Sequence, residues 1–229
     1  MKKLLNYFTK FEIGLWLSSV VIIIVTFFVF KDKDYLTLTA SLFGATFLIL
    51  NAKGNPLGQF LTIVFSILYG FISYRFAYYG EMITYLCMSM PMALVALIAW
   101  LKNPYKGKKS QVKVNLISTK EALLLVLVTV IVSIVFYFIL EYFNTANLIP
   151  STISVTTSFF AAYLTFRRSP YFALAYAMND LVLIVLWALA SMTDISYLSV
   201  VICFIVFFVN DMYGFVSWRK MEKNQKSNM

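Results

Sequence analysis

The stretch from Tyr176 to Trp187 carries an aspartate and an asparagine inside an apolar run long enough to cross a lipid bilayer. Tyr176, Asp180 and Trp187 are spaced by four and seven residues, so they share one face of a helix, with Asn179 at its edge. A charge at that depth costs at least about 2.5 kcal/mol, and membrane helices carry one where it faces a cavity, a partner or a substrate. A column of hydroxyl, carboxylate and indole suits a flat polar or cationic ligand. The alternative is a hydrogen-bonded contact that only joins helices.

Polar residues also follow one face of the third apolar run. They recur at three- and four-residue steps and are Gln59, Thr62, Ser66, Tyr69 and Ser73. A narrow hydrophilic seam on an apolar helix predicts the lining of a wet path, although close helix packing by itself also accounts for Ser66 and Ser73.

The last apolar run carries a third polar group. Asn210 and Tyr213 lie on one helical face, and Asp211 lies beside them. Asp211 is near the basic end of this run, where Arg219 or Lys220 could reach its carboxylate. A salt-bridged structural role and a functional role for Asp211 are therefore both open.

The composition is that of a membrane protein. The chain of 229 residues is 61% hydrophobic and 13% charged, with a mean hydropathy of +0.82, whereas about 25% of the residues in a soluble domain are charged. Its net charge of +9 could suggest nucleic acid, but the basic residues lie in short loops between apolar runs. We therefore predict a lipid bilayer as the surroundings and no nucleic-acid partner.

The residue types needed for most enzymatic chemistry are missing. The chain has no His, which is the commonest metal ligand and general base, and Cys87 and Cys203 lie in apolar runs as small buried hydrophobic residues. Asp180 and Asp211 would suit an intramembrane aspartyl protease, but neither has the Gly-x-Gly-Asp context of such enzymes. We predict no catalytic residue, no metal, no cofactor and no enzymatic activity.

Eight apolar runs are long enough to span a membrane. They cover roughly residues 13–30, 36–51, 56–77, 82–101, 121–142, 150–166, 171–191 and 196–218. With both termini in the cytoplasm, the 19 Lys and Arg residues, beginning with Lys2 and Lys3, all lie inside except Lys31, Lys33 and Arg75. This alternation predicts an all-α polytopic membrane protein with eight transmembrane helices.

The chain contains a weak internal repeat of three helices. Asn55-Pro56 opens the third run and Ser169-Pro170 opens the seventh, 114 positions later, each as a cap followed by Pro at the first helical position. Trp100 and Trp218 close the fourth and eighth runs, 118 positions apart. Three helices, one linker helix and three more give a 3+1+3 parallel repeat like that of the SWEET proteins, preceded by one extra N-terminal helix.

This organisation divides the chain into five segments. They are residues 1–35 (N-terminal tail and extra helix), 36–101 (first three-helix repeat), 102–148 (basic cytoplasmic loop and linker helix), 149–221 (second three-helix repeat) and 222–229 (cytoplasmic tail). We interpret the basic stretch from Lys102 to Lys120 as a solvated linker attracted to anionic lipid headgroups.

Five motifs make the chain resemble the Pnu family of bacterial vitamin transporters. They are Tyr-Gly-Phe-Ile-Ser-Tyr at 69–74, Tyr-Tyr-Gly-Glu-Met at 78–82, Pro-Met at 91–92, Asn-Asp-Leu-Val-Leu-Ile-Val-Leu-Trp at 179–187 and Asn-Asp-Met-Tyr-Gly-Phe-Val-Ser-Trp-Arg-Lys at 210–220. The resemblance implies a 3+1+3 core that assembles as a homotrimer in the bacterial inner membrane. It also implies facilitated diffusion of a vitamin precursor, which phosphorylation by a cytoplasmic kinase then traps.

The resemblance and the polar stripes together define the expected substrate-binding residues. By motif, the family's aromatic and amide ligands correspond to Asn179, Asp180, Trp187, Asn210 and Tyr213. Side-chain chemistry and helical phase add Gln59, Tyr69 and Tyr176. The expected function is uptake of nicotinamide riboside, with Asp180 offsetting the positive ring and Trp187 stacking on it.

The identity of the vitamin is open at this point. Relatives place an amide side chain after the Pro-Met pair, whereas this chain has Ala93. The same mechanism for thiamine, riboflavin or a deoxynucleoside is one alternative, and a membrane scaffold that transports nothing is another.

Overall fold

The computed structural model describes residues 7–30, 34–75 and 79–227, and within these ranges it contains eight helical spans long and apolar enough to cross a membrane. They are α2 (Lys10–Val29), α3 (Tyr35–Ala52), α4 (Pro56–Arg75), the continuous span α5–η1–α6 (Tyr79–Ile83, Thr84–Ser89, Met90–Lys102), α7 (Thr119–Tyr142), α8 (Leu148–Phe166), α9 (Phe172–Ser191) and α10 (Leu198–Ser227) after the 3-10 turn η2 (Ile195–Tyr197). The predicted eight spans are confirmed. Lys2, Lys3, Lys31, Lys33 and Tyr78 lie outside the described residues.

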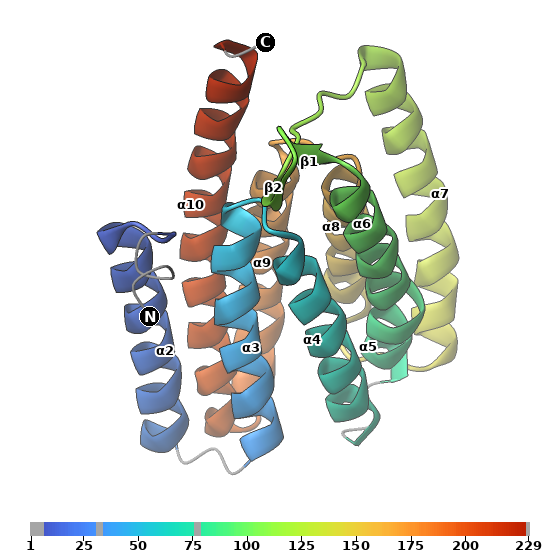
Figure 1. Cartoon of the computed structure of the whole chain (residues 1–229). Helices are drawn as coiled ribbons and strands as arrows, with labels where there is room; N and C mark the ends of the chain where they lie inside the picture. Colours follow the sequence, from blue (N-terminus) through green and yellow to red (C-terminus); the bar gives the residue numbers. More distant parts are fainter. Residues whose placement is uncertain (1–6, 31–33, 76–78, 228–229) are drawn as a thin grey trace.

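The helices form one bundle in which α2 and α7 lie at opposite sides (Figure 1). Between them, α10 packs on α9, α3 and α2, while α8 packs on α7, α9 and α6. The strands β1 (Pro104–Tyr105) and β2 (Lys108–Val112) form a short hairpin at one end of the bundle, the same end at which the chain terminates (Figure 1). We refer to this end as the hairpin end.

Most helix ends agree with the apolar runs, but α10 does not stop at residue 218. It continues to Ser227 because Glu222 binds both Arg219 (2.5 Å) and Lys226 (2.7 Å), pairs that stabilise a helix outside the apolar region. The span containing Pro91 departs from ideal geometry as a π-helical turn at Thr84–Ser89. Proline has no N–H for the usual ladder, and wide turns of this kind occur often at functional sites.

Helices α2 and α7 begin in the same way. Glu12 is the third residue of α2 and forms an ion pair with Lys53, the residue that caps the next helix (3.1 Å). Glu121 is the third residue of α7 and binds Arg167, which caps α8. This hydrogen-bonded carboxylate raises the pKa of the Arg167 guanidinium. The helix predicted to lie outside the repeat therefore meets the first triplet much as the linker helix meets the second.

Two tryptophans bind across the triplets at the hairpin end. Trp100 Nε1 donates to the backbone oxygen of Thr165 (2.8 Å), and Trp218 Nε1 donates to that of Asn51 (2.7 Å). Both indoles are fully buried, with ring centroids 5.4 Å apart. The acceptors are 114 positions apart and the donors 118, the offsets found in the sequence. These matched bonds support the predicted repeat.

The interpretation of the inter-triplet stretch as a purely solvated linker is wrong. Its lysines are exposed, but Val112 is fully buried and donates its backbone N–H to the oxygen of Gly54 (2.9 Å). Asn115 N donates to the oxygen of Arg168 (3.1 Å). Gly54 and Arg168 both have positive φ and follow the first helix of their triplets, so the linker joins the two triplets at equivalent turns.

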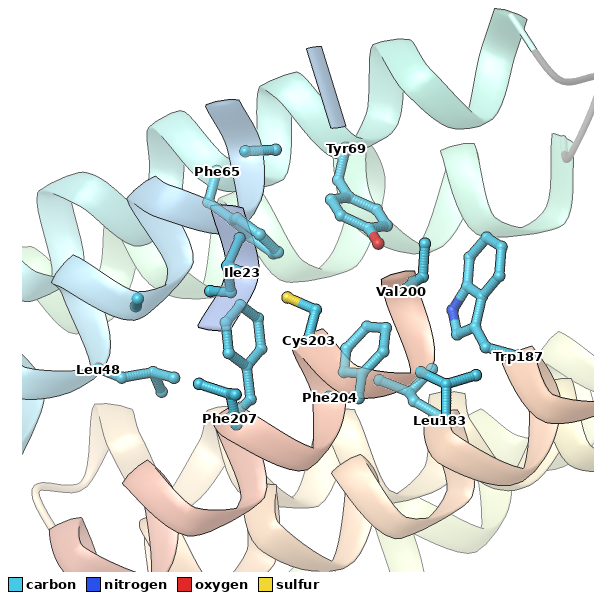
Figure 2. Packing of buried hydrophobic residues seen from close by; sticks show 14 of the residues in the cluster. Ile23, Leu48, Phe65, Tyr69, Leu183, Trp187, Val200, Cys203, Phe204 and Phe207 are labelled. Carbon is cyan, nitrogen blue, oxygen red and sulfur yellow. The ribbon is translucent and has the colours of Figure 1, made fainter. Parts of the chain in front are cut away.

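Apolar side chains of both triplets form the main core cluster. Figure 2 shows that the labelled side chains come together from α2, α3, α4, α9 and α10: Ile23, Leu48, Phe65, Tyr69, Leu183, Trp187, Val200, Cys203, Phe204 and Phe207. Aromatic pairs of this kind each contribute about 0.5–1.5 kcal/mol beyond their burial. Cys203 is buried as expected, whereas the prediction for Cys87 is wrong, because it lies exposed on the outer surface of its helix.

Replacing Trp100 or Trp218 by Phe should destabilise the bundle by a similar amount, on the order of 2 kcal/mol, through one lost hydrogen bond and a packing defect. Thermal unfolding of the purified protein in detergent measures the effect. Trp16→Phe is the matched control, because half-buried Trp16 binds only a side chain, Thr46 Oγ1 (3.2 Å), and should unfold near the wild-type temperature. Equal stability of all three variants would show that the cross-triplet bonds do not hold this end.

Gly58 allows α4 to approach α3 closely, since a Cβ there would fall on the side chain and the backbone nitrogen of Asn51. We expect Gly58→Ala to cost about 1–3 kcal/mol, as overpacked sites do. The control is Gly14→Ala on α2, where nothing lies within 4 Å of the added Cβ and the higher helix propensity of Ala should be neutral or stabilising. Thermal unfolding of both variants tests the close approach, which a fully stable Gly58→Ala protein would rule out.

Candidate functional site

A central cavity lies between the two triplets. Its walls come from α3, α4 and η1 on one side and from α8, α9 and α10 on the other. Among the lining residues that the structure describes, none is Lys or Arg. The polar lining consists of amides, hydroxyls and two carboxyl groups, and the remaining walls are largely aromatic rings. The cavity is therefore suited to an uncharged or cationic molecule with flat apolar parts.

Asp180 of α9 and Asp211 of α10 form the acidic wall of this cavity. Each residue is only 5% exposed, and the two line the same cavity from neighbouring helices. Arg219, one of the two basic residues expected to reach Asp211, pairs with Glu222. Two acidic groups in one buried wall form the strongest electrostatic feature of the cavity.

Two amide side chains are held in fixed orientations on opposite walls. Asn179 Oδ1 accepts hydrogen bonds from Ser154 (3.2 Å) and Thr157 (2.7 Å) of α8. Gln59 Nε2 donates to Asn51 Oδ1 (2.9 Å). In these orientations Asn179 retains an N–H donor and Gln59 retains an oxygen acceptor for a ligand.

The structure brings together four of the eight residues predicted to bind substrate. The cavity lining contains Gln59, Tyr176, Asn179 and Asp180. Thr62 and Ser66 also line it, so the first part of the predicted seam on α4 does border the cavity.

Two of the remaining predicted residues lie just beyond the lining. Trp187 packs against Tyr197, with ring centroids 5.5 Å apart, and Tyr69 packs against Tyr85 at 4.9 Å. Since Tyr85 itself lines the cavity, Tyr69 supports the wall from behind. Direct binding by Trp187 and Tyr69 stays a prediction.

Asn210 and Tyr213 face α2 and not the cavity. Asn210 Nδ2 donates to Ser19 Oγ (2.9 Å), and the Tyr213 hydroxyl donates to Glu12 Oε1 (2.8 Å). The sequence assigned the polar face of α10 to substrate because helical periodicity shows that a face is polar but not which neighbour it meets. Here that neighbour is the N-terminal helix.

Sequence reasoning missed Asn51, Tyr85 and Asp211 as lining residues. Asn51 is the last residue of the apolar run 36–51, where no polar residue three or four positions before it marks a helical face. Tyr85 lies in a run with no regular polar spacing, and its only signal was the nearby Pro91, which the π-helical turn accompanies.

A second, smaller cavity continues from the central one. Tyr85, Ser89, Ser158 and Leu183 line both, and the smaller one extends to Glu81 near the start of α5. This start lies at the end of the bundle opposite the hairpin (Figure 1). A polar path thus leads from the centre away from the hairpin end, while the two tryptophans fill the other side.

The comparisons with known proteins agree with this architecture. A family model described as nicotinamide mononucleotide transporter matches residues 34–220. The nicotinamide riboside transporter PnuC of Neisseria mucosa is 25% identical over 226 residues, which cover 97% of this chain and 86% of that protein.

The crystal structure of the vitamin B3 transporter PnuC has the same fold. It superposes with a TM-score of 0.81 at 24% sequence identity, covering 95% of this chain and 94% of that one. The family consists of membrane transporters and not of enzymes. Because the family model spans most of the chain, this multi-pass membrane protein belongs to the nicotinamide mononucleotide transporter family.

Proposed function

We propose that this protein takes up nicotinamide riboside across the bacterial inner membrane by facilitated diffusion. The observation that carries the proposal is the central cavity, in which two carboxyl groups meet two oriented amides among aromatic rings and no described lining residue is basic. Nicotinamide riboside joins a flat cationic pyridinium ring and a carboxamide to a ribose. Membership of the transporter family and the name of the relative in Neisseria mucosa support the same choice.

Each part of this ligand has a counterpart in the cavity. Asp180 and Asp211 offset the positive ring, which stacks on aromatic walls such as Tyr85. The Asn179 amide donates to the carboxamide oxygen or a ribose hydroxyl, and Gln59 accepts from one. Trp187, predicted from the sequence to stack on the ring, is not among the lining residues of either cavity, and its direct contact with the ligand remains part of this proposal.

The same chemistry favours the riboside over its phosphorylated form. A phosphate would add two negative charges to a wall that already holds two carboxyl groups, and no described lining residue is a Lys or Arg that could pair with it. A deoxynucleoside or riboflavin lacks the positive charge that the acidic wall would select. Thiamine is flat and cationic, so the acidic wall favours it as the second candidate.

The direction of transport follows from the predicted topology. With the basic loops and both termini in the cytoplasm, the hairpin end is the cytoplasmic end. The tryptophan pair then closes the inner side while the second cavity leads outwards, which is the state that receives ligand from outside. Phosphorylation of the incoming riboside by a cytoplasmic kinase keeps its internal concentration low, so no ion gradient is needed. Assembly as a homotrimer is part of this proposal.

A thermal-shift panel tests the substrate. Nicotinamide riboside should stabilise the purified protein by about 2.7 kcal/mol at a hundred-fold excess over Kd, since a ligand stabilises the state it binds. Thiamine, riboflavin, a deoxynucleoside and nicotinamide mononucleotide should shift it less. Asp180→Asn should abolish most of the shift, whereas Asp194→Asn in the exposed loop after α9 should not.

Uptake into vesicles tests transport itself. Vesicles that contain the protein, a riboside kinase and ATP should accumulate labelled nicotinamide riboside, and vesicles without the kinase should only equilibrate. Stabilisation by thiamine alone would reassign the substrate. No accumulation of nicotinamide riboside, thiamine, riboflavin or a deoxynucleoside, each tested with its cognate kinase, would favour a scaffold that transports nothing.

A further inference from the structure

An open apolar groove lies on the outer surface of the second triplet and shares no lining residue with the central cavity. Its residues come from α7, α8 and α9, and α8 packs on both of the other helices. The groove has a volume of about 660 Å³, and its lining includes Ala122, Phe160, Leu164, Ala175 and Met178. Met178 is 53% exposed, so the groove opens to the surroundings of the bundle, which in a membrane are lipid.

The threonines of this groove have their hydrogen bonds inside the protein. Thr129 and Thr156 each donate to the backbone oxygen four residues earlier (2.7 and 2.8 Å), and Thr157 donates to Asn179 Oδ1 (2.7 Å). The surface that these hydroxyls leave to a ligand is therefore apolar. Such a surface suits a hydrocarbon chain and not a polar vitamin.

The groove begins at the hairpin end of the bundle. Ile117 and Tyr171 line it there, just before α7 and α9 begin. Met178 lies seven residues further along the chain, which places it about 10 Å deeper at the rise of an α-helix. The groove therefore accepts a chain that enters from the membrane surface at this end.

Basic side chains surround the mouth of the groove. Arg168 lies in the turn that leads to Tyr171, and the guanidinium of Arg219 lies over the Tyr171 ring, 5.2 Å from its centroid. Lys120 is exposed in the first turn of α7, two positions before Ala122 of the lining. Clusters of this kind at a membrane surface attract anionic lipid headgroups.

Arg168 is the basic residue with the clearest need for an anion. Its Nε atom is buried and has no hydrogen-bond partner among the residues that the structure describes. Burial and the charge of the neighbouring Arg167 lower the pKa of the Arg168 guanidinium. A phosphate oxygen at this place would supply both a hydrogen-bond acceptor and a negative charge.

The charges favour a lipid over a second copy of the chain as the occupant. A copy in the same membrane orientation would bring its own hairpin end to the mouth of the groove. The described glutamates at that end are already bound to basic residues: Glu12 to Lys53, Glu121 to Arg167, and Glu222 to Arg219 and Lys226. A copy would therefore add positive charge to a basic mouth, whereas an anionic lipid neutralises it.

We propose that this groove binds an acyl chain of an anionic phospholipid, whose phosphate is held at the hairpin end by Arg168 and Arg219. The bound lipid connects the linker helix α7 with α9 of the second triplet. The site requires only that the bundle lies in a membrane, so it does not depend on which vitamin the protein carries.

Native mass spectrometry of the full-length protein in a non-ionic detergent tests the headgroup. Phosphatidylglycerol and phosphatidylcholine with the same acyl chains are compared, and we expect phosphatidylglycerol to bind more tightly. Arg168→Gln and Arg219→Gln should each lower the affinity for phosphatidylglycerol about five-fold and leave that for phosphatidylcholine unchanged. Arg75→Gln, at the end of α4 away from the hairpin, is the matched control and should bind both lipids as the wild type does.

Substitutions in the groove test the acyl chain. Ala175→Phe should fill the groove and reduce the number of tightly bound phosphatidylglycerol molecules by one. The control is Ala188→Phe, on the same helix but exposed and outside the lining, which should keep this lipid. If Ala175→Phe does not fold, Ala122→Phe narrows the groove from the α7 side, and the arginine variants test the headgroup with the groove intact.

Four results would overturn the proposal. Equal affinity for the two lipids excludes a site for an anionic headgroup, and a preference that survives both arginine variants places that site elsewhere. Glycerol phosphate binding as tightly as phosphatidylglycerol would show that no acyl chain is held. A change of oligomeric state in Ala175→Phe, without loss of the lipid, would show that the groove is a contact between copies of the chain.

Discussion

Two carboxyl groups buried side by side between α9 and α10 set the conditions that the rest of the bundle must meet. Asp180 and Asp211 cannot be covered by apolar side chains alone, so the helices around them leave a cavity lined by amides and hydroxyls. That cavity requires aromatic walls that keep their shape when it is empty, and the rings of Phe65 and Phe207 supply them from opposite triplets.

The hairpin end is built for closure. The indoles of Trp100 and Trp218 each reach across to a backbone oxygen of the other triplet, so any opening at this end must break both bonds or rotate both rings. The linker also binds α10 at this end. The side-chain amide of Gln225 on α10 donates to the backbone oxygen of Val112 and accepts from the backbone nitrogen of Val114. The extension of α10 that carries Gln225 is therefore part of the closure and not a loose tail.

Hydropathy and loop charge predicted the eight spans because crossing a bilayer requires long apolar helices, and the sequence of every span meets this requirement. The same rule explains why the end of α10 was missed, since Glu222 and its basic neighbours form a helix outside the apolar region. The hairpin at Pro104–Val112 left no signal, because its strands are short and rich in lysine. Its order comes from a few backbone hydrogen bonds to distant turns.

The site was predictable where a single helix determines it. Asp180, Asn179 and Tyr176 share one face of α9, and the cost of burying a charge identified that face directly. On α10 two polar faces compete, and the choice between Asp211 and the pair Asn210 and Tyr213 depends on which helix packs where. Tertiary packing alone decides this.

The N-terminal helix resolves that choice, and its contacts argue that it is more than an addition to the bundle. Glu12 binds the cap of α3 through Lys53 and also accepts from Tyr213 of α10. Glu121 of α7 makes the corresponding pair with Arg167 and accepts from Tyr163. A glutamate in the first turn of the helix therefore binds the residue that caps the first helix of the triplet in both halves of the chain. For this reason the chain is better described as two units of four helices than as a core with an extra helix. In such a unit α2 occupies one polar face of α10, which leaves Asp211 as the carboxyl group free to face the cavity.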